Sequence, residues 1–264
     1  AEFPAVTLLP AGGNLGFAGA NNLALPRARG AHLLLLNPDT VCPPDSLDRL
    51  LACAEAHPGH GGYGPLLTDA AGRPTITCGN FPARRLHWLR PLATLPLGRR
   101  WRRWAQFTHV PGGDEPAHRV DYVAGACLLV PRAAYEAVGP LDDRFFLYFE
   151  ETDWCQRAWQ QGLPILLCPR VAVIHLEGRA AEQVSRFSLQ QFQDSYRRFV
   201  AKHHGPAAVR SFRLALAWEK TLLALRHALQ PWPRRHRALA RRYAFEARLQ
   251  LQDDITPPPT PHAP

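Results

Sequence analysis

The first group of residues that could do chemistry is acidic and follows a run of leucines. The segment LLLLNPDT (33–40) ends on Asn37, Pro38 and Asp39. A carboxylate that follows a buried strand and is stiffened by proline suits Mg²⁺, which takes one or two protein carboxylates and further ligands from substrate phosphates. The alternative is that Asp39 caps the helix expected next, because Asp is a favoured N-cap residue.

A second acidic group lies in LYFEETDWCQR (147–157), where Glu150, Glu151 and Asp153 are crowded together. Like charges and apolar neighbours raise the pKa of a carboxyl, so one of these acids is a candidate general base. Two structural alternatives stay open. Acids stabilise the first turn of a helix through its dipole, and Asp153 has Arg157 four residues later as a helical ion-pair partner.

Two weaker groups complete the candidates. His175 ends the apolar run VAVIH, where a lone histidine is more often a satisfied core residue than a metal ligand. The segment NLGFAGANN (14–22) contains Asn14, Gly16 and Asn22, a composition that lets backbone approach a ligand closely. It lacks the G-x-G-x-x-G spacing of a dinucleotide site, so the signal is weak.

The elements that position these residues alternate between short apolar runs and helical patterns. We expect buried strands at 5–10 and 32–37, a helix at 18–28, and a helix that starts at Pro44 or Asp45 and stops at 57–59. Asp39 then lies at the carboxyl end of a strand, where open α/β sheets bind ligands. Further predicted elements are strands at 63–79 around a turn at 69–72, at 120–131, 164–169 and 171–178, helices at 132–138 and up to Gly162, and a helical region beyond 182 with breaks at 205–206 and 231–233.

Charge is uneven along the 264 residues, whose formal net charge is +9. Residues 195–250 carry 13 Lys and Arg against 2 acids, and residues 84–104 carry seven Arg, three Trp and no acid. Such patches suit phosphates, nucleic acid or acidic lipid. The segment 209–229 is basic and amphipathic, as in helices that lie on a membrane surface, although it would also suit a helix packed on its own domain.

The six cysteines are scattered, and none forms a C-x-x-C pair. We therefore expect no zinc site, and we expect reduced thiols in a cytoplasmic protein. We read no secretory leader, and no charge-free apolar run reaches the length of a membrane-spanning helix. No internal repeat is found, and the segment 253–264 is Pro-rich and expected to be disordered.

Taken together, five segments resemble bacterial family-2 glycosyltransferases, especially the rhamnosyltransferase-like branch. They are NLGFAGANN, LLLLNPDT, DYVAGACLLVPR, VGPLDDRFFLYFEETDWCQR and VIHLEG, in this order over about residues 5–180. The resemblance implies an α/β GT-A fold: a Rossmann-like, mostly parallel sheet with flanking helices. It implies a glycosyltransferase domain at 1–180, a basic helical extension at 181–252 and a disordered tail at 253–264.

The resemblance also implies roles for single residues. Asn37-Pro38-Asp39 matches the family's D-x-D metal motif, with Asn in place of the first acid and Asp39 as the ligand of Mg²⁺ or Mn²⁺. His175 matches a histidine that joins the metal in some relatives. Glu151 matches the base, with Glu150 supporting it. Donor binding falls to Asn14, Gly16, Asn22, Asn37 and Asp39, and acceptor or sugar binding to Gly125, Ala126 and Asp153.

The implied reaction is an inverting transfer of a sugar, for example rhamnose, from a dTDP- or UDP-sugar to a lipid-linked or polysaccharide acceptor of the cell envelope. The enzyme would work in the cytoplasm, with peripheral contact to the inner face of the plasma membrane.

The family pattern normally starts with a strand, a helix and a second strand, and only AEFPA precedes VTLLP here. We therefore expect an N-terminally incomplete domain, and a non-catalytic remnant is the alternative. The acidic site argues against a third reading, a basic nucleic-acid binder.

Overall fold

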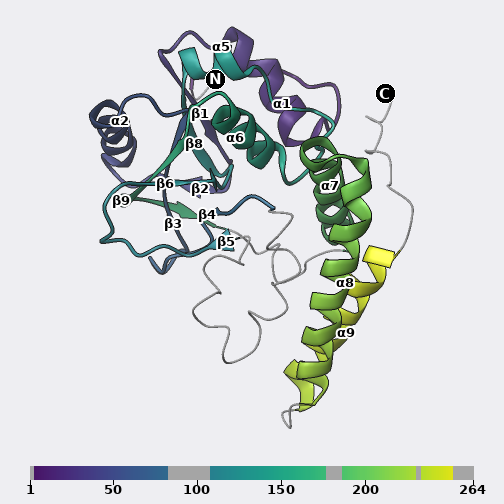
Figure 1. The fold of residues 1–264 in the computed structure, drawn as a ribbon. Helices are drawn as coiled ribbons and strands as arrows, with labels where there is room; N and C mark the ends of the chain where they lie inside the picture. Colours follow the sequence, from purple (N-terminus) through teal and green to yellow (C-terminus); the bar gives the residue numbers. More distant parts are fainter. Residues whose placement is uncertain (1–2, 83–107, 177–185, 230–232, 252–264) are drawn as a thin grey trace.

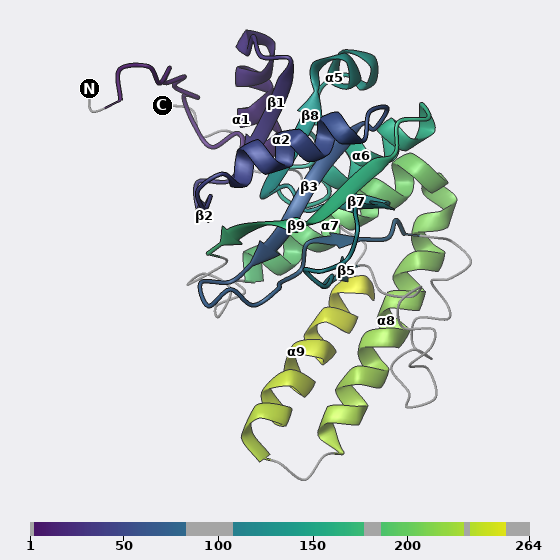
Figure 2. The ribbon, with the colours of Figure 1, turned by 90° about the vertical axis from the view of Figure 1, so that its left-hand side faces the viewer.

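The computed structural model describes residues 3–82, 108–176, 186–229 and 233–251, and shows an α/β part followed by a set of long helices (Figure 1). The predicted patch at 84–104 and the predicted tail at 253–264 lie outside the described residues. The α/β part contains the central sheet with helices packed on it. The long helices lie beside the sheet and extend away from it (Figures 1 and 2).

The central sheet has the strand order β1-β8-β3-β9-β2, with β6 also paired to β9. The three strands β1 (His32–Leu36), β3 (Gly62–Thr68) and β9 (Ile165–His175) run in the same direction, since β3 is parallel to β9 and both β1 and β3 are antiparallel to β8. β8 (Cys127–Pro131), β2 (Thr40–Val41) and β6 (His118–Val120) run the opposite way. The predicted α/β class with flanking helices is confirmed, and β1, β3 and β9 share one direction, with β3 and β9 as the parallel pair.

A small second sheet has the order β5-β4-β7, formed by β5 (Thr108–His109), β4 (Cys78–Gly79) and β7 (Tyr122–Val123). Three predictions about strands need correction. The run 120–131 is not one strand, because Tyr122–Val123 belongs to β7 in the small sheet and Cys127–Pro131 to β8 in the central sheet. The runs 164–169 and 171–178 do not form two strands, because β9 is continuous and has a register shift opposite Pro65 and Leu66. In β1 only Leu33 and Leu35 are buried, whereas Leu34 and Leu36 point to an exposed face.

The predicted strand at 5–10 is wrong. This segment is irregular, and it pairs with no strand among the described residues. Phe3, Val6 and Leu8 are 66–83% exposed. An apolar run becomes a strand only where neighbouring strands satisfy its backbone groups, and the apolar composition alone supplies none.

Two layers of helices cover the sheet. On one side lie α1 (Gly16–Ala24), the short 3₁₀ helix η1 (Leu25–Arg27), α5 (Arg132–Val138) and α6 (Glu150–Gln160), which share one apolar core with β1 and β8. On the other side α2 (Ser46–Ala56) buries Leu50 and Ala54 against β3 and β9. The predicted helices are therefore all found, with the one expected at 18–28 starting two residues earlier.

The long helices are α7 (Arg186–His204), α8 (Pro206–Ala228) and α9 (Pro233–Leu251). The predicted break at 205–206 is confirmed: Gly205 has a φ of 84°, a left-handed conformation that favours glycine, and Pro206 begins α8. The second predicted break, at 231–233, falls between α8 and α9. α7 packs Phe199 and Val200 against Phe145 and Phe149 of the α/β part, whereas α8 and α9 form a hairpin that projects away from it (Figure 2).

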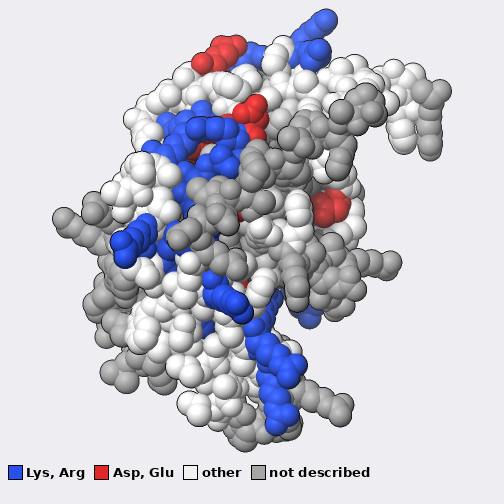
Figure 3. Space-filling model, turned by 90° about the vertical axis from the view of Figure 1, so that its right-hand side faces the viewer, with Lys and Arg blue, Asp and Glu red and all other residues white. Residues whose placement is uncertain are grey.

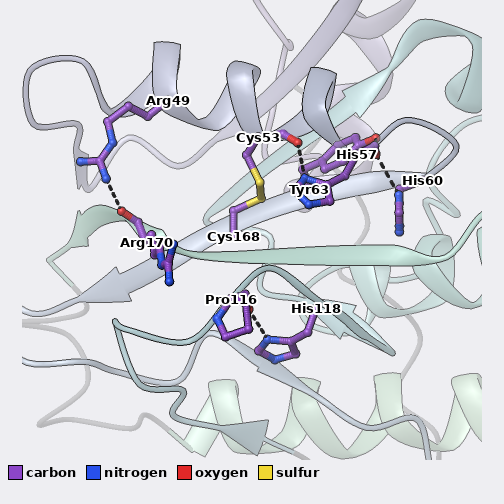
Figure 4. The surroundings of a disulfide bond; sticks show 9 residues. All are labelled: Arg49, Cys53, His57, His60, Tyr63, Pro116, His118, Cys168 and Arg170. Carbon is purple, nitrogen blue, oxygen red and sulfur yellow. Dashed lines mark hydrogen bonds between the residues drawn. A yellow bond between two sulfur atoms is a disulfide. The ribbon is translucent and has the colours of Figure 1, made fainter.

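The expectation of reduced cysteines is wrong for two of the six. Cys53 on α2 and Cys168 on β9 form a disulfide, with Cα atoms 6.6 Å apart (Figure 4). Their separation of 115 residues gives no hint of pairing, and it is the packing of α2 on β9 that brings them together. The other four cysteines take no part in the disulfide, and three of them are buried.

In the described part of the chain, none of the helices combines the length and the apolar character that crossing a membrane requires.

Candidate functional site

The loop after β1 is fixed by backbone bonds that place Asn37 and Asp39 next to two other strands. The Asn37 N–H donates to the carbonyl of Ala126, at 2.9 Å, and the carbonyl of Asn37 accepts from the Thr40 hydroxyl at 2.6 Å. The chain then turns into β2, which pairs with the end of β9 so that Thr40 lies opposite His175. The proline-stiffened turn therefore presents Asp39 at the edge of β9.

Asp39 and His175 meet at this edge. The Oδ1 atom of Asp39 lies 3.2 Å from Nε2 of His175, and the Leu176 N–H donates to the Asp39 carbonyl at 2.8 Å. The Asp39 side chain is 50% exposed, whereas that of His175 is 9% exposed. Asp39 does not cap the following helix, because the N-cap of α2 is Asp45. The pairing predicted from two distant motifs is thus present in the structure.

The Gly125–Ala126 turn connects this pair to the second acidic group. While Ala126 accepts from Asn37, Gly125 lies directly against Glu151. A Cβ atom on Gly125 would lie 3.4 Å from Cβ of Glu151 and 3.5 Å from the ring of Phe17. One tight turn thereby contacts both acidic groups, and a side chain at Gly125 would have to fit between Glu151 and Phe17.

Glu150 and Glu151 begin α6, after an unusual backbone. Tyr148 and Phe149 both have positive φ values, 69° and 70°, a conformation that costs of order 1–3 kcal/mol for such residues and clusters at functional sites. The α7 helix supports the strained turn, because the ring of Phe149 packs against Tyr196 and Phe199. The aromatic packing offsets this strain and sets where the two glutamates emerge.

The two glutamates differ in their surroundings. Glu150 is 5% exposed, and its Oε2 atom has no hydrogen-bond partner among the residues that the structure describes. Burial, and then the charge of Glu151, raise the pKa of Glu150 well above its usual range. Burial also raises the pKa of Glu151, but hydrogen bonds from its own N–H and those of Thr152 and Gly125 oppose the shift. Hydrogen-bond donors therefore favour the charged form of Glu151, whereas burial with fewer such donors favours the protonated form of Glu150.

Asp153 belongs to a buried network of charges. Its side chain is fully buried, and it accepts from Arg157 at 2.9 Å, from Lys202 at 2.8 Å and from the ring of His203 at 2.7 Å. Although burial opposes them, the bonds from His203 and Lys202 hold the pKa of Asp153 below its usual value. The predicted ion pair with Arg157 is confirmed. An acceptor could not reach this carboxylate, so we reinterpret Asp153 as a residue that joins α6 to α7.

Lys202 and His203 are residues whose role sequence reasoning missed. Both lie in the segment RRFVAKHHG, which the resemblance places in a C-terminal extension without assigning a function. Lys202 also binds Asp142 at 2.7 Å, and the Ser195 hydroxyl donates to the Leu147 carbonyl at 2.8 Å. The only signal in the sequence was that Lys202 and His203 lie together in the last turn of a helix. Basic residues are common there because they interact favourably with the helix dipole, so the pair did not stand out.

The predicted donor-binding residues of the first loop have mostly structural bonds. Asn14 accepts from the Gly16 N–H at 3.1 Å, and a Cβ on Gly16 would lie 2.2 Å from the carbonyl oxygen of Phe146, so no other residue fits there. The amide of Asn22 donates to the Leu141 carbonyl at 2.8 Å and accepts from the Leu141 N–H at 3.1 Å. Gly16 and Asn22 thus pin α1 to the segment that leads into the glutamates.

The Asp39–His175 pair is suited to a divalent cation. A carboxylate oxygen and an imidazole nitrogen 3.2 Å apart match the about 3.0 Å between neighbouring ligands of a six-coordinate ion with bonds of about 2.1 Å. Across the described ranges, no group of three or more His, Cys, Asp or Glu side chains gathers to hold a metal. A cation here would therefore take its remaining ligands from substrate phosphates and water.

Comparison with known proteins assigns the family. Residues 1–192 match the family described as "Glycosyltransferase like family 2", and the chain belongs to that family. It is 30% identical over 217 residues to the N-acetylglucosaminyl-diphospho-decaprenol L-rhamnosyltransferase of Mycobacterium tuberculosis, covering 77% of this chain and 69% of the relative. It is 26% identical over 201 residues to the low-salt glycan biosynthesis hexosyltransferase Agl10 of Haloferax volcanii, covering 74% of this chain and 59% of that protein.

Two solved structures are also similar. One is GalNAc-T7 with UDP, GalNAc and Mn²⁺, at 15% identity and a TM-score of 0.45, with 88% of this chain and 41% of that one covered. The other is the mannosyltransferase PcManGT from Pyrobaculum calidifontis in complex with GDP-Man and Mn²⁺, at 13% identity and a TM-score of 0.47, with 89% and 64% covered.

Proposed function

We propose that this chain is an inverting glycosyltransferase that transfers a hexose, with rhamnose the leading candidate, from a dTDP- or UDP-sugar to a lipid-diphosphate-linked glycan. The observation that carries the proposal is the turn at Gly125 and Ala126, which accepts a hydrogen bond from Asn37 through Ala126 and packs on Glu151 through Gly125. The family membership supports sugar transfer, and the name of the mycobacterial relative supports rhamnose and a lipid-linked acceptor.

Asp39 and His175 hold Mg²⁺ or Mn²⁺ in this proposal, and Asn37 helps to orient the donor. When bound, the cation offsets the negative charge that grows on the departing nucleoside diphosphate. The half-exposure of Asp39 suits this role, because it leaves room for phosphate oxygens and water beside the carboxylate.

Glu151 takes the proton from the acceptor hydroxyl, and that oxygen attacks the anomeric carbon as the bond to the diphosphate oxygen breaks. The single displacement inverts the configuration of the sugar. Burial raises the pKa of Glu151 and so makes it a stronger base than an ordinary glutamate. The raised pKa of Glu150 favours its protonated form, which adds no second charge beside Glu151.

The remaining predicted residues have supporting roles. Gly125 and Ala126 line the place where donor sugar and acceptor meet, and the lack of a side chain at Gly125 keeps that place open. Asn14, Gly16 and Asn22 shape the donor side through the backbone rather than by direct side-chain contact. Asp153, with Lys202 and His203, positions Glu151 from two residues away.

A transfer assay tests the proposal. The chain is incubated with dTDP-rhamnose or UDP-hexoses and a short-chain prenyl-diphospho-N-acetylglucosamine, with Mn²⁺ or with a chelator, and products are read by mass spectrometry. We expect a product one deoxyhexose or hexose heavier, its formation abolished by Glu151→Gln and unaffected by Glu136→Gln, an exposed glutamate of α5. A wild-type chain that makes no product and binds no nucleoside diphosphate would favour the non-catalytic remnant instead.

A further inference from the structure

One face of α8, continued by its C-cap residue Leu229, carries large apolar side chains that stay substantially exposed. Leu214, Trp218, Leu225 and Leu229 are 44%, 51%, 55% and 85% exposed. Their spacing of four, seven and four residues puts them in one stripe along the helix, because 3.6 residues make a turn. The stripe is about 22 Å long at 1.5 Å per residue. We call these four residues the apolar stripe.

The stripe does not belong to the contacts between the helices. The face of α8 that meets α9 is marked by Lys220, which pairs with Glu246 at 2.7 Å, and by His227, which stacks on Tyr243. Phe212 and Leu216 point into the core shared with α7. Four large apolar residues in one row are therefore left on the outside of a hairpin that projects from the molecule (Figure 2).

The charges around the stripe have one sign. α8 and α9 together hold ten Lys and Arg and only two acids, Glu219 and Glu246, and both acids are buried at 8% and 4% exposure. Arg210 and Arg226 are exposed beside the stripe on α8, and Arg237, Arg241 and Arg248 are exposed on α9. In Figure 3 the lower part of the molecule, where these helices lie, shows blue and white with almost no red.

A hollow at the base of the hairpin adds a place for an anionic group. It has a volume of about 440 Å³ and is lined by Arg210, Arg213, Leu214, Gln250 and Leu251. The Nε–H of Arg213 donates to the carbonyl of Gln250 at 2.7 Å, and this bond fixes the guanidinium at the side of the hollow. The hollow therefore places two arginines next to an apolar surface. That surface is formed by Leu214, the first residue of the apolar stripe, and by Leu251, which is 62% exposed.

We infer that this surface docks the protein on a bilayer that contains anionic phospholipid. The apolar stripe enters the boundary between headgroups and acyl chains, and Arg210 and Arg213 take a lipid phosphate in the hollow. A second copy of the chain is a poorer occupant, because two hairpins with a large positive charge would repel each other. Nucleic acid would satisfy the arginines but would leave the leucines exposed. The inference extends the proposed function, in which the acceptor is lipid-linked.

Vesicle flotation tests it on the whole chain. We compare vesicles of phosphatidylcholine alone with vesicles that contain about 30 mol% phosphatidylglycerol. We expect the wild type to float with the anionic vesicles only, and this binding to weaken as salt rises. Trp218→Ser with Leu225→Ser should lower the partition coefficient at least roughly ten-fold, and Arg210→Gln with Arg213→Gln by roughly ten-fold or more at low salt.

Matched variants separate the stripe from general effects. Ile76→Ser removes an apolar residue that is 46% exposed on the α/β part, and Arg29→Gln removes an exposed charge there; both should float like the wild type. Glu151→Gln should also float normally, because docking needs neither donor nor cation, so a failed transfer assay leaves this test intact. Wild-type protein that stays unbound, or a stripe variant that floats unchanged, would overturn the inference. A stable dimer of the wild type that becomes monomeric in the Trp218→Ser/Leu225→Ser variant would also overturn it.

Discussion

The two acidic regions of the site are built by different means. Asp39 and His175 are positioned by backbone: a hydrogen bond from Asn37 to Ala126 and the pairing of β2 with β9. Glu150 and Glu151 are positioned by side chains, through a strained turn packed on α7 and a buried charge network with Lys202 and His203. The first region needs only the sheet, whereas the second needs the C-terminal helices.

The difference extends to electrostatics. The carboxylate of Asp39 is half exposed and open to solvent. Those of Glu150 and Glu151 have pKa values raised by burial. A charged, accessible acid suits a metal ligand, and a desolvated acid suits a proton acceptor. Two acidic motifs that look alike in sequence are therefore placed in opposite surroundings, one open to solvent and one buried. Substitutions in one region should leave the function of the other region unchanged.

The largest effect is expected for Glu151→Gln. Loss of a general base lowers the transfer rate by about 10²–10⁴-fold, while donor binding on the Asp39 side stays within a few-fold of the wild type. Steady-state rates and calorimetric binding of the donor, measured in parallel, check both parts. If donor affinity fell as steeply as the rate, the two regions would not be separable in this way.

Next in size is Asp153→Asn, which leaves Lys202 and His203 facing a neutral partner. Breaking a buried charge network of this kind costs about 3–5 kcal/mol in the free energy of unfolding, and denaturant melts measure it. We expect kcat to fall with little change in the KM for the donor, because Glu151 shifts and Asp39 does not. Asp143→Asn, an exposed neighbour outside the network, is the control. An equal rise in donor KM would contradict the assignment to the base side.

Asp39→Asn should act on the other region. Removing the charge that faces His175 weakens metal-dependent donor binding by roughly ten-fold to a hundred-fold, the range in which metal sites respond to loss of supporting groups. The stability of the fold should change by less than about 0.5 kcal/mol, because the side chain is half exposed. Thermal melting with and without Mn²⁺ distinguishes the outcomes, and a large loss of stability without metal would show a structural role instead.

The smallest effect is expected for Glu150→Gln. A folded-state pKa raised by burial means that the protonated form is favoured on folding, so the stability that it contributes at low pH is lost as pH rises through the raised pKa. Gln cannot ionise, and it should therefore stabilise the protein by roughly 1–3 kcal/mol at neutral pH and by almost nothing in acid. Melts across pH measure the trend; a stabilisation that grew toward low pH would show that the sign is wrong.

Much of this site was accessible from sequence because its motifs are local. LLLLNPDT, the acids before Trp154 and the histidine that ends β9 each sit at an element boundary that glycine, proline and apolar patterning mark. Their order along the chain carried the family resemblance. The break at Gly205 and the end of α8 before α9 begins at Pro233 were equally readable, since Gly and Pro mark helix boundaries in the sequence.

What the sequence did not reveal depends on contacts between distant segments. Cys53 and Cys168 are 115 residues apart and pair because α2 packs on β9. Asp153 looked like a substrate contact until Lys202 and His203, some fifty residues later, proved to surround it. The segment 5–10 shows the converse: local apolar composition predicted a strand, but a strand needs neighbours that composition does not supply.

The central claim is that Asp39 with His175 binds the metal and donor phosphates while Glu151 serves only the acceptor proton. Titration calorimetry of dTDP and UDP in the presence of Mn²⁺, on the wild type, Asp39→Asn and Glu151→Gln, tests it most directly. The account predicts binding by the wild type and by Glu151→Gln, and binding weakened at least roughly ten-fold in Asp39→Asn. Binding that Asp39→Asn leaves unchanged, or that Glu151→Gln abolishes, would contradict it.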